Sequence, residues 1–167
     1  QLFDAPSLYL IDSILHINNL SLSEIYDFFI PSHDIQELTC SISDYVIKRI
    51  EKKDIVNIKN MEKYDNALCL DDSISMNEIV YVALAGEEIA SIAGTSSNTE
   101  KIWWIGVDTN ISHRRKGLGS FLVNRIACDI IKLGKIPVYP TWYSNISSRL
   151  TAIKAGFLPG YVEIECE

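Results

Sequence analysis

Residues 114–120 read Arg-Arg-Lys-Gly-Leu-Gly-Ser and lie between a strand-like run at 101–109 and a helix-like run at 121–133. The first backbone N–H groups of a helix have no acceptor within it, and the helix dipole adds positive charge there. Gly117 and Gly119 have no Cβ, so the turn can take positive φ and a phosphate can approach the backbone closely. The pattern predicts a pyrophosphate-binding turn, although a chance helix start with a solvated basic face fits the same residues.

The segment after this helix predicts a strand that separates from one neighbour. Residues 136–142 are apolar and strand-like, but Pro137 and Pro140 cannot donate hydrogen bonds to a sheet ladder. Asn145 then opens a short amphipathic helix that Gly156 ends. Residues 161–166 alternate as a last strand.

Residues from about 79 to 165 resemble a GNAT-type N-acetyltransferase. In that family a strand, a turn of the pattern R/Q-x-x-G-x-G/A and a helix bind the pyrophosphate of acetyl-CoA. A second signature places Gly-Phe eleven and twelve residues after an Asn, as in Asn145, Gly156 and Phe157. The resemblance implies an acyl-CoA N-acyltransferase fold of the α/β or α+β class, with a central mixed sheet, splayed strands and flanking helices.

The resemblance also implies how acetyl-CoA is held, with no metal. Its pantetheine amides are expected to pair with the backbone around 107–109, and its pyrophosphate to lie on the N–H groups of 115–120. Asn145 resembles the family's Asn that reaches the pantetheine arm, and it also fits a plain helix cap. The cofactor-binding residues implied are Val107, Asp108, Thr109, Arg114, Arg115, Lys116, Gly117, Leu118, Gly119, Ser120, Asn145 and Ser148.

The catalytic residues follow less directly. Asp108 is the only carboxylate in its strand, and beside indole rings its pKa is expected to rise, which suits a general base. The alternative is that Asp108 anchors the turn through the backbone N–H groups of 110–111. Many relatives carry a Tyr seven residues after the Asn to protonate the thiolate, but this chain has Ala152 there. Either Tyr143, Ser148 or water then takes that role, or the thiolate leaves without assistance.

Aromatic residues near these motifs allow two further interpretations. His113 is more often structural than catalytic in such a position. The residues Trp103, Trp104, Trp142 and Tyr143 either wall an acceptor pocket or belong to the core.

Charge is distributed unevenly along the 167 residues, whose formal net charge is −7. Residues 1–72 hold 6 basic and 13 acidic side chains, whereas residues 73–167 hold 9 of each. No basic footprint for nucleic acid is present in the sequence. The acidic part either steers a cationic amine or simply keeps the surface solvated.

Other compositional features predict a cytoplasmic protein that does not bind membranes. No apolar run reaches the roughly 18 residues of a membrane span, and no signal peptide is visible at the start. The four cysteines are widely spaced and without a His cluster, so we expect reduced thiols and no metal site.

The pattern before residue 73 predicts a helical region packed on a core of residues 73–167. Apolar spacing favours helices at 7–17, 21–30 and 34–51, a short strand at 67–70 and a boundary loop at 71–77. Runs at 78–84 and 88–95 predict a hairpin, followed by the strand at 101–109. Only one clear strand follows Phe157, from which we expect a homodimer in which the partner completes the sheet edge.

Two functions from different classes fit these observations. The first is an N-acetyltransferase that moves an acetyl group from acetyl-CoA to a primary amine of a small molecule or peptide, by direct transfer in a ternary complex. The alternative is a non-catalytic acyl-CoA-binding sensor or regulatory module on the same fold, which Ala152 keeps open.

Overall fold

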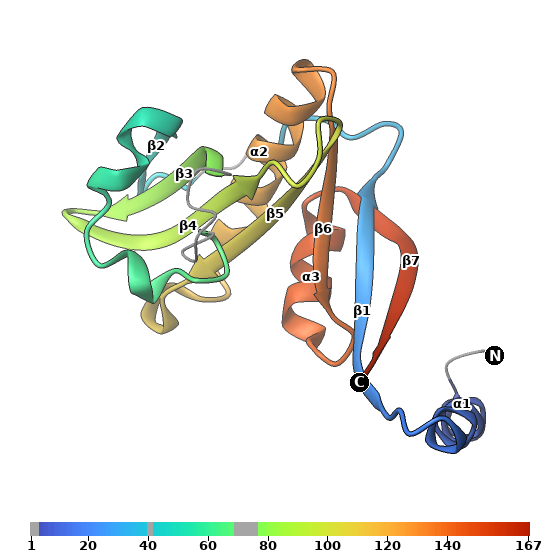
Figure 1. Ribbon diagram of the computed structural model, residues 1–167. Coiled ribbons are helices and arrows are strands. Elements are labelled where there is room, and N and C mark those ends of the chain that lie inside the picture. Colours follow the sequence, from blue (N-terminus) through green and yellow to red (C-terminus); the bar gives the residue numbers. More distant parts are fainter. Residues whose placement is uncertain (1–3, 40–41, 69–76) are drawn as a thin grey trace.

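The structure, a computed structural model, describes residues 4–39, 42–68 and 77–167. Its strands form one mixed sheet in the order β2-β3-β4-β5-β6-β1-β7 (Figure 1). The strands are β1 Leu22–Pro31, β2 Val46–Glu51, β3 Asn77–Ala85, β4 Glu88–Ser96, β5 Ile102–Thr109, β6 Ile136–Trp142 and β7 Phe157–Cys166. The helices are α1 Ala5–Ile17, α2 Leu118–Lys132 and α3 Ile146–Lys154, with short 3-10 turns η1 Lys52–Asn57, η2 Met61–Lys63 and η4 Ile111–His113.

The sheet opens between β5 and β6, its only parallel pair among the described strands. These two strands are in register from Ile102–Ile136 to Trp104–Val138 and no further. Beyond that point β5 continues on β4 as far as Thr109, and β6 continues on β1 as far as Trp142. The expected splayed strands are therefore confirmed, and Figure 1 shows the two halves of the sheet diverging.

The helix expected at 21–30 is wrong, because this segment forms β1. β1 lies between β6 and β7 and is antiparallel to both. The apolar spacing of 22, 25, 26, 29 and 30 resembles a helix because apolar side chains stand on both faces of this interior strand. Tyr26 and Phe28 point to one face of the sheet, and Phe29 points to the helix-covered face.

The helix expected at 34–51 is also wrong. Residues 46–51 form edge strand β2, paired with β3, and residues 35–39 have no regular secondary structure. The buried Asn124 of α2 explains why residues 36–38 stay extended. Its Oδ1 accepts from Leu38 N–H at 2.8 Å, and its Nδ2 donates to the carbonyls of Gln36 at 2.9 Å and Ala155 at 3.0 Å. One amide thus binds two backbone groups that a helix at 34–51 would have needed, and also the carbonyl that ends α3.

These corrections change the view of residues 1–72. Only α1 keeps the expected helical character, whereas β1 and β2 are integral strands of the sheet. The last strand, β7, is longer than expected and pairs with β1 of the same chain, so a partner strand is not needed to pair it. The homodimer itself stays a prediction. The short strand expected at 67–70 is absent at 67–68, and residues 69–70 and most of the boundary loop lie outside the described residues.

The remaining elements agree with the expectations from the sequence, and they create two apolar layers. The larger cluster lies under α2 and α3 and includes Phe29, Leu122, Tyr139 and Phe157. The smaller one lies on the opposite face of β3 and β4, under the segment 55–68. We call the first face the helix face and the second the open face, because none of the described helices packs across β6, β1 and β7 on that side (Figure 1).

We predict that Asn124→Ala lowers the free energy of unfolding by about 2–3 kcal/mol, because it leaves buried backbone groups without partners. Asn57→Ala, an exposed residue of η1, is the matched control and is expected to change stability by less than about 0.5 kcal/mol. Urea denaturation of both variants measures the difference. Equal stabilities would show that solvent or local rearrangement satisfies the segment at 36–38.

Candidate active site

The turn at 114–120 has the geometry of an anion cradle. Arg115 and Gly117 both take positive φ, 60° and 81°, and Gly117 caps α2. Among the described residues, none of the backbone N–H groups of 115–120 has an acceptor, and the first paired one is Phe121, which donates to the Gly117 carbonyl. Alternating backbone conformations of this kind point successive N–H groups into one concavity.

The basic side chains of this turn differ in what they contact. Arg114 Nε donates to the Thr109 carbonyl at 3.1 Å, which ties the turn to the end of β5. Lys116 Nζ donates to Tyr45 Oη at 3.1 Å, and Arg115 is exposed. A Cβ at position 119 would lie 3.4 Å from Thr109 Oγ1 and 3.6 Å from Val107 Cγ2, which is ordinary van der Waals contact, so the start of α2 packs directly on the end of β5. The end of β5 and the start of α2 therefore form one rigid corner.

Asn145 and Ser148 lie at the start of α3, on the other side of the opening. Asn145 Oδ1 caps the helix by accepting from Ser148 N–H at 3.1 Å, so the capping interpretation is confirmed. Ser148 Oγ lies 2.8 Å from the hydroxyl of Tyr139, a residue that the sequence analysis did not single out. The only sequence signal for it was its position between Pro137 and Pro140, and the structure adds that it lies one residue after the pairing with β5 ends.

Asp108 is half-buried on the open face of β5. Its carboxylate accepts from Asn66 Nδ2 at 2.7 Å and from Ala67 N–H at 2.9 Å. The N–H of Asn110 donates instead to the Ala90 carbonyl, so Asp108 anchors the segment 66–67 and not the turn at 110–111. Burial raises the pKa of Asp108, and the hydrogen bonds from Asn66 and Ala67 partly offset that rise. A hollow of about 150 Å³ adjoins it, with Arg114 and Tyr64 in its lining.

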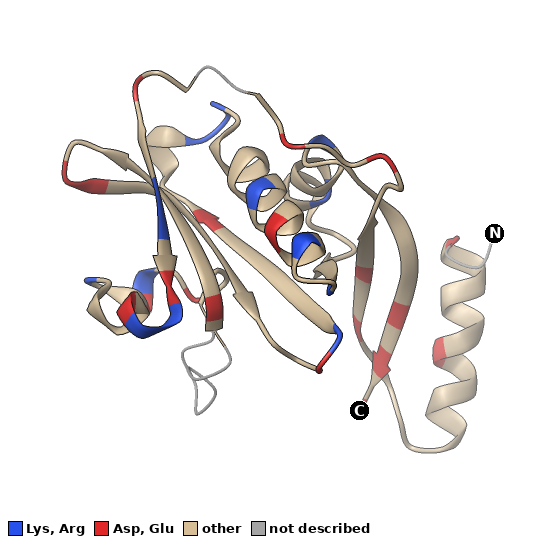
Figure 2. Cartoon of the chain, turned by 90° about the horizontal axis from the view of Figure 1, so that it is seen from above, with Lys and Arg blue, Asp and Glu red and all other residues tan. Residues whose placement is uncertain are grey.

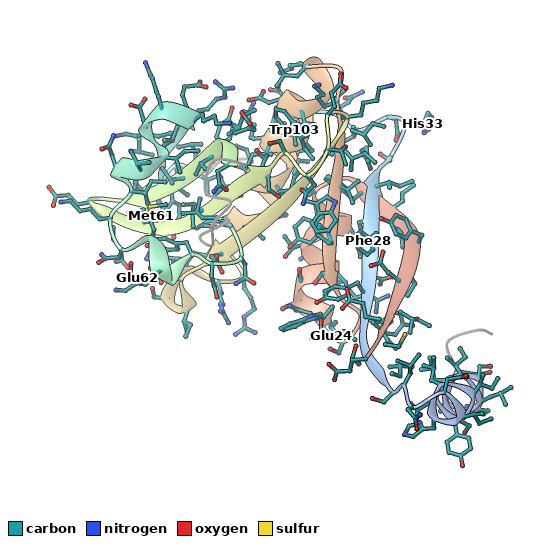
Figure 3. The ribbon with its side chains drawn as sticks, in the orientation of Figure 1. Glu24, Phe28, His33, Met61, Glu62 and Trp103 are labelled. Carbon is teal, nitrogen blue, oxygen red and sulfur yellow. The ribbon has the colours of Figure 1, made fainter. Side chains whose placement is uncertain are left out.

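Aromatic and acidic side chains share the open face beside the splayed strands. Phe28 of β1 stacks on Tyr161 with ring centroids 4.5 Å apart and meets Trp104 edge-on at 5.8 Å. Glu24 accepts from Trp142 Nε1 at 3.3 Å and from the hydroxyl of Tyr26. Figure 3 shows Glu24 and Phe28 along the same strand. Strands β6, β1 and β7 contain no Lys or Arg, and Figure 2 shows their acidic positions.

The sequence matches no family model and no curated protein, so the comparison rests on solved structures. A GCN5-related N-acetyltransferase-like protein from Streptococcus suis has a TM-score of 0.65 at 14% identity, covering 98% of this chain and 68% of that one. A proposed GNAT-family acetyltransferase from Novosphingobium aromaticivorans has a TM-score of 0.64 at 15% identity, covering 88% and 65%. An acetyltransferase from Bacillus subtilis in complex with CoA has a TM-score of 0.54 at 25% identity, covering 68% and 76%.

This chain has the GNAT fold. The turn at 114–120 and the residues Asn145, Gly156 and Phe157 predicted this resemblance to GNAT-type N-acetyltransferases, and the comparisons confirm it for the fold. The chain spans about two thirds of the length of the Novosphingobium and Streptococcus proteins, which are longer.

Within this GNAT fold, the four aromatic residues considered for an acceptor pocket lie in different places. Trp104 and Trp142 lie on the open face, whereas Trp103 packs against the core on the helix face. Tyr143 lies under the guanidinium of Arg149, 4.7 Å from its ring centroid, and Arg149 Nε is 2.6 Å from the buried Asp27 carboxylate. That contact ties α3 to β1.

His113 has a structural environment in this GNAT fold. Its Nδ1 lies 2.9 Å from Tyr45 Oη, and the two rings meet edge-on with centroids 5.6 Å apart. The imidazole therefore packs under the turn, as the structural interpretation expects.

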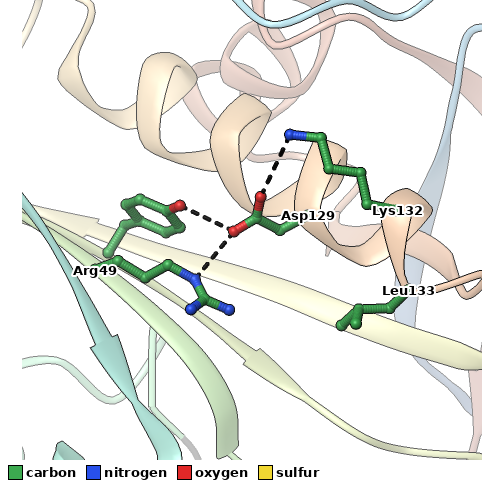
Figure 4. Close-up of a pocket in the computed structure, with 5 residues that line it drawn as sticks. Arg49, Asp129, Lys132 and Leu133 are labelled. Atoms are coloured by element: carbon green, nitrogen blue, oxygen red, sulfur yellow. Dashed lines mark hydrogen bonds and ion pairs between the residues drawn. The ribbon is translucent and has the colours of Figure 1, made fainter.

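A separate hollow of about 360 Å³ lies at the far end of α2 (Figure 4). Asp129 there accepts from Tyr81 Oη at 2.9 Å and from Arg49 Nε at 3.1 Å. Burial and the hydrogen bond to Asp129 raise the pKa of Tyr81 to about 12. Its polar groups satisfy one another, so we interpret the hollow as structural.

Two other expectations concern cysteines and membranes. Cys128 is free and buried, and Cys166 is free and exposed, whereas Cys40 and Cys69 lie outside the described residues. Within residues 4–39, 42–68 and 77–167 there is no group of side chains able to hold a metal ion. None of the described helices is long and apolar enough to cross a membrane.

We predict that Asp108→Asn changes the pH dependence of stability. Because the folded-state pKa of Asp108 is raised, the folded protein holds this proton more tightly than the unfolded chain, and ionisation costs stability. The stability of the wild type minus that of the variant should fall as pH rises from about 4 through the raised pKa. Thermal unfolding between pH 4 and 7 measures this difference, with the exposed Glu87→Gln as control. A difference that rises with pH would contradict burial as the dominant cause.

Proposed function

We propose that this chain is an acetyl-CoA-dependent N-acetyltransferase that acts on a primary amine by direct transfer in a ternary complex. One observation carries the proposal: β5 and β6 separate beside a turn whose N–H groups at 115–120 have no acceptor among the described residues. The Bacillus subtilis neighbour, whose structure contains CoA, supports the cofactor.

The residues that would hold acetyl-CoA fit its chemistry. The N–H groups of 115–120 and the exposed Arg115 suit a pyrophosphate. The edge of β5 from Ile105 to Thr109 faces the opening, and there the pantetheine amides would add hydrogen bonds as an extra strand does. Bound there, acetyl-CoA supplies an activated acetyl group as its thioester.

We further propose that the acceptor is a cationic amine that approaches over the open face. Trp104, Trp142 and Tyr161 are exposed aromatic rings, and Glu24 and Glu163 add negative charge with no basic side chain on strands β6, β1 or β7. Aromatic faces and carboxylates together favour a cation. Asp108, also on this face, has a raised pKa that suits the acceptance of a proton from the amine.

A non-catalytic acyl-CoA-binding module remains the second candidate, favoured by Ala152 in place of the usual Tyr. Both candidates require cofactor binding, but only the enzyme releases free thiol. A thiol-release assay over a panel of amines therefore separates them. Binding without release on any amine would favour the module.

We predict that Arg115→Glu weakens acetyl-CoA binding by about 10- to 100-fold, because it replaces a charge-assisted contact by repulsion. Lys59→Glu makes the same change in charge at an exposed site in the segment at 52–68, and it should bind like the wild type. Calorimetric titration measures both dissociation constants. If the wild type, properly folded, does not bind acetyl-CoA, the proposed function fails.

We predict that Glu163→Lys raises KM for a cationic amine such as spermidine by about tenfold, which corresponds to roughly 1.4 kcal/mol. KM for acetyl-CoA should stay unchanged, because this side chain lies on the open face of β7. Glu87→Lys, in the turn between β3 and β4, controls for the change in net charge. Equal effects of the two substitutions would contradict an acceptor site on the open face.

A further inference from the structure

The absence of a tyrosine at position 152 leaves the departing sulfur without its usual acid, and the structure contains another buried tyrosine nearby. Tyr139 is 2% exposed and belongs to the same apolar cluster as Ala152, which is fully buried. Its hydroxyl lies 2.8 Å from Ser148 Oγ. Ser148 is one turn before Ala152, on the same face of α3. The Tyr139 hydroxyl thus reaches the helix face on which the family's tyrosine would stand.

The position of Tyr139 in β6 places it at the opening. Val138 is the last residue of β6 in register with β5, and Tyr139 is the next one along the strand. From there on β6 is paired only with β1, where Tyr139 faces Phe29. A side chain at this point lies where the two strands begin to separate, between β5 on one side and α3 on the other.

Resting on the proposed function, we propose that Tyr139 is the general acid of the acetyl transfer and that Ser148 is its positioning residue. In this step the bond between the amine nitrogen and the acetyl carbon forms, and the bond between that carbon and sulfur breaks. The sulfur takes the proton of Tyr139 Oη, and Tyr139 takes a proton from Ser148 Oγ. Ser148 regains one from water at the start of α3. The acceptor is cationic, so its nitrogen gives up two protons. One goes to Asp108 before the attack, and the second goes to solvent as the new bond forms and replaces the proton that Ser148 takes from water, which balances the exchange.

The protonation state of Tyr139 agrees with this role. Burial raises the pKa of Tyr139, the negative charge of Asp108 raises it further, and the hydrogen bond with Ser148 acts in the opposite direction. The hydroxyl is therefore protonated at neutral pH and able to donate.

The test uses the pKa of the thiol of bound CoA, measured by thiolate absorbance in the binary complex, because this needs no knowledge of the amine. A hydroxyl that donates to the sulfur stabilises the thiolate, so Tyr139→Phe should raise that pKa by about one unit, a tenfold change in ionisation. Ser148→Ala should raise it less, and Ser148→Thr should restore it. In turnover, Tyr139→Phe should lower kcat by about 100-fold with little change in the dissociation constant of acetyl-CoA.

Two tyrosine variants serve as controls. Tyr81 lies in β3, and its hydroxyl donates to Asp129 near the end of α2. Tyr81→Phe removes this hydroxyl and should leave the thiol pKa unchanged. Tyr143→Phe tests the acid expected from the sequence. An unchanged thiol pKa in Tyr139→Phe, or a shift only in Tyr143→Phe, would overturn the inference while acetyl-CoA binding still stands. Failure of the wild type to bind CoA would instead reject the proposed function.

Discussion

The structure depends on the limited pairing of β5 with β6. A strand directs its backbone N–H and C=O groups to both of its sides, so two strands that separate each need a continuous partner on the outer side to stay in place. Here β4 holds β5 as far as Thr109, and β1 holds β6 as far as Trp142. The opening is stable because each arm is part of a complete antiparallel sheet. Its inner edges keep the hydrogen-bonding capacity that an extended, amide-bearing molecule can use.

The two faces of this opening differ in chemistry. The helix face brings together the N–H groups at 115–120, the start of α3 and the buried Tyr139–Ser148 pair. The open face presents aromatic rings with Glu24 and Asp108. In the proposed reaction, the anionic cofactor and the cationic amine would approach from opposite sides of one sheet, which separates their opposite electrostatic requirements.

The sequence predicted the half after residue 73 well because its signals are local. Glycines, prolines and a capping Asn fix the turn at 114–120, β6 and α3 by backbone geometry alone. The errors at 21–30 and 34–51 arose where long-range contacts decide. β1 is a strand because it pairs with β6 and β7, which are distant in sequence. Residues 36–38 are extended because Asn124 binds their backbone. Tyr139 was missed because its partner, Ser148, becomes a neighbour only when α3 folds back.

The insertion of β1 between β6 and β7 also constrains the order of assembly. A strand from residues 22–31 finds its partners only in residues 136–142 and 157–166, and backbone bonds join Ser21 to Glu167 in both directions. A chain synthesised from its N-terminus must therefore carry this apolar strand unpaired until more than a hundred further residues have emerged. The turn and α2 can form earlier, but the second arm of the opening is completed last. In a newly made chain, the turn at 114–120 would therefore form before the opening between β5 and β6 is complete.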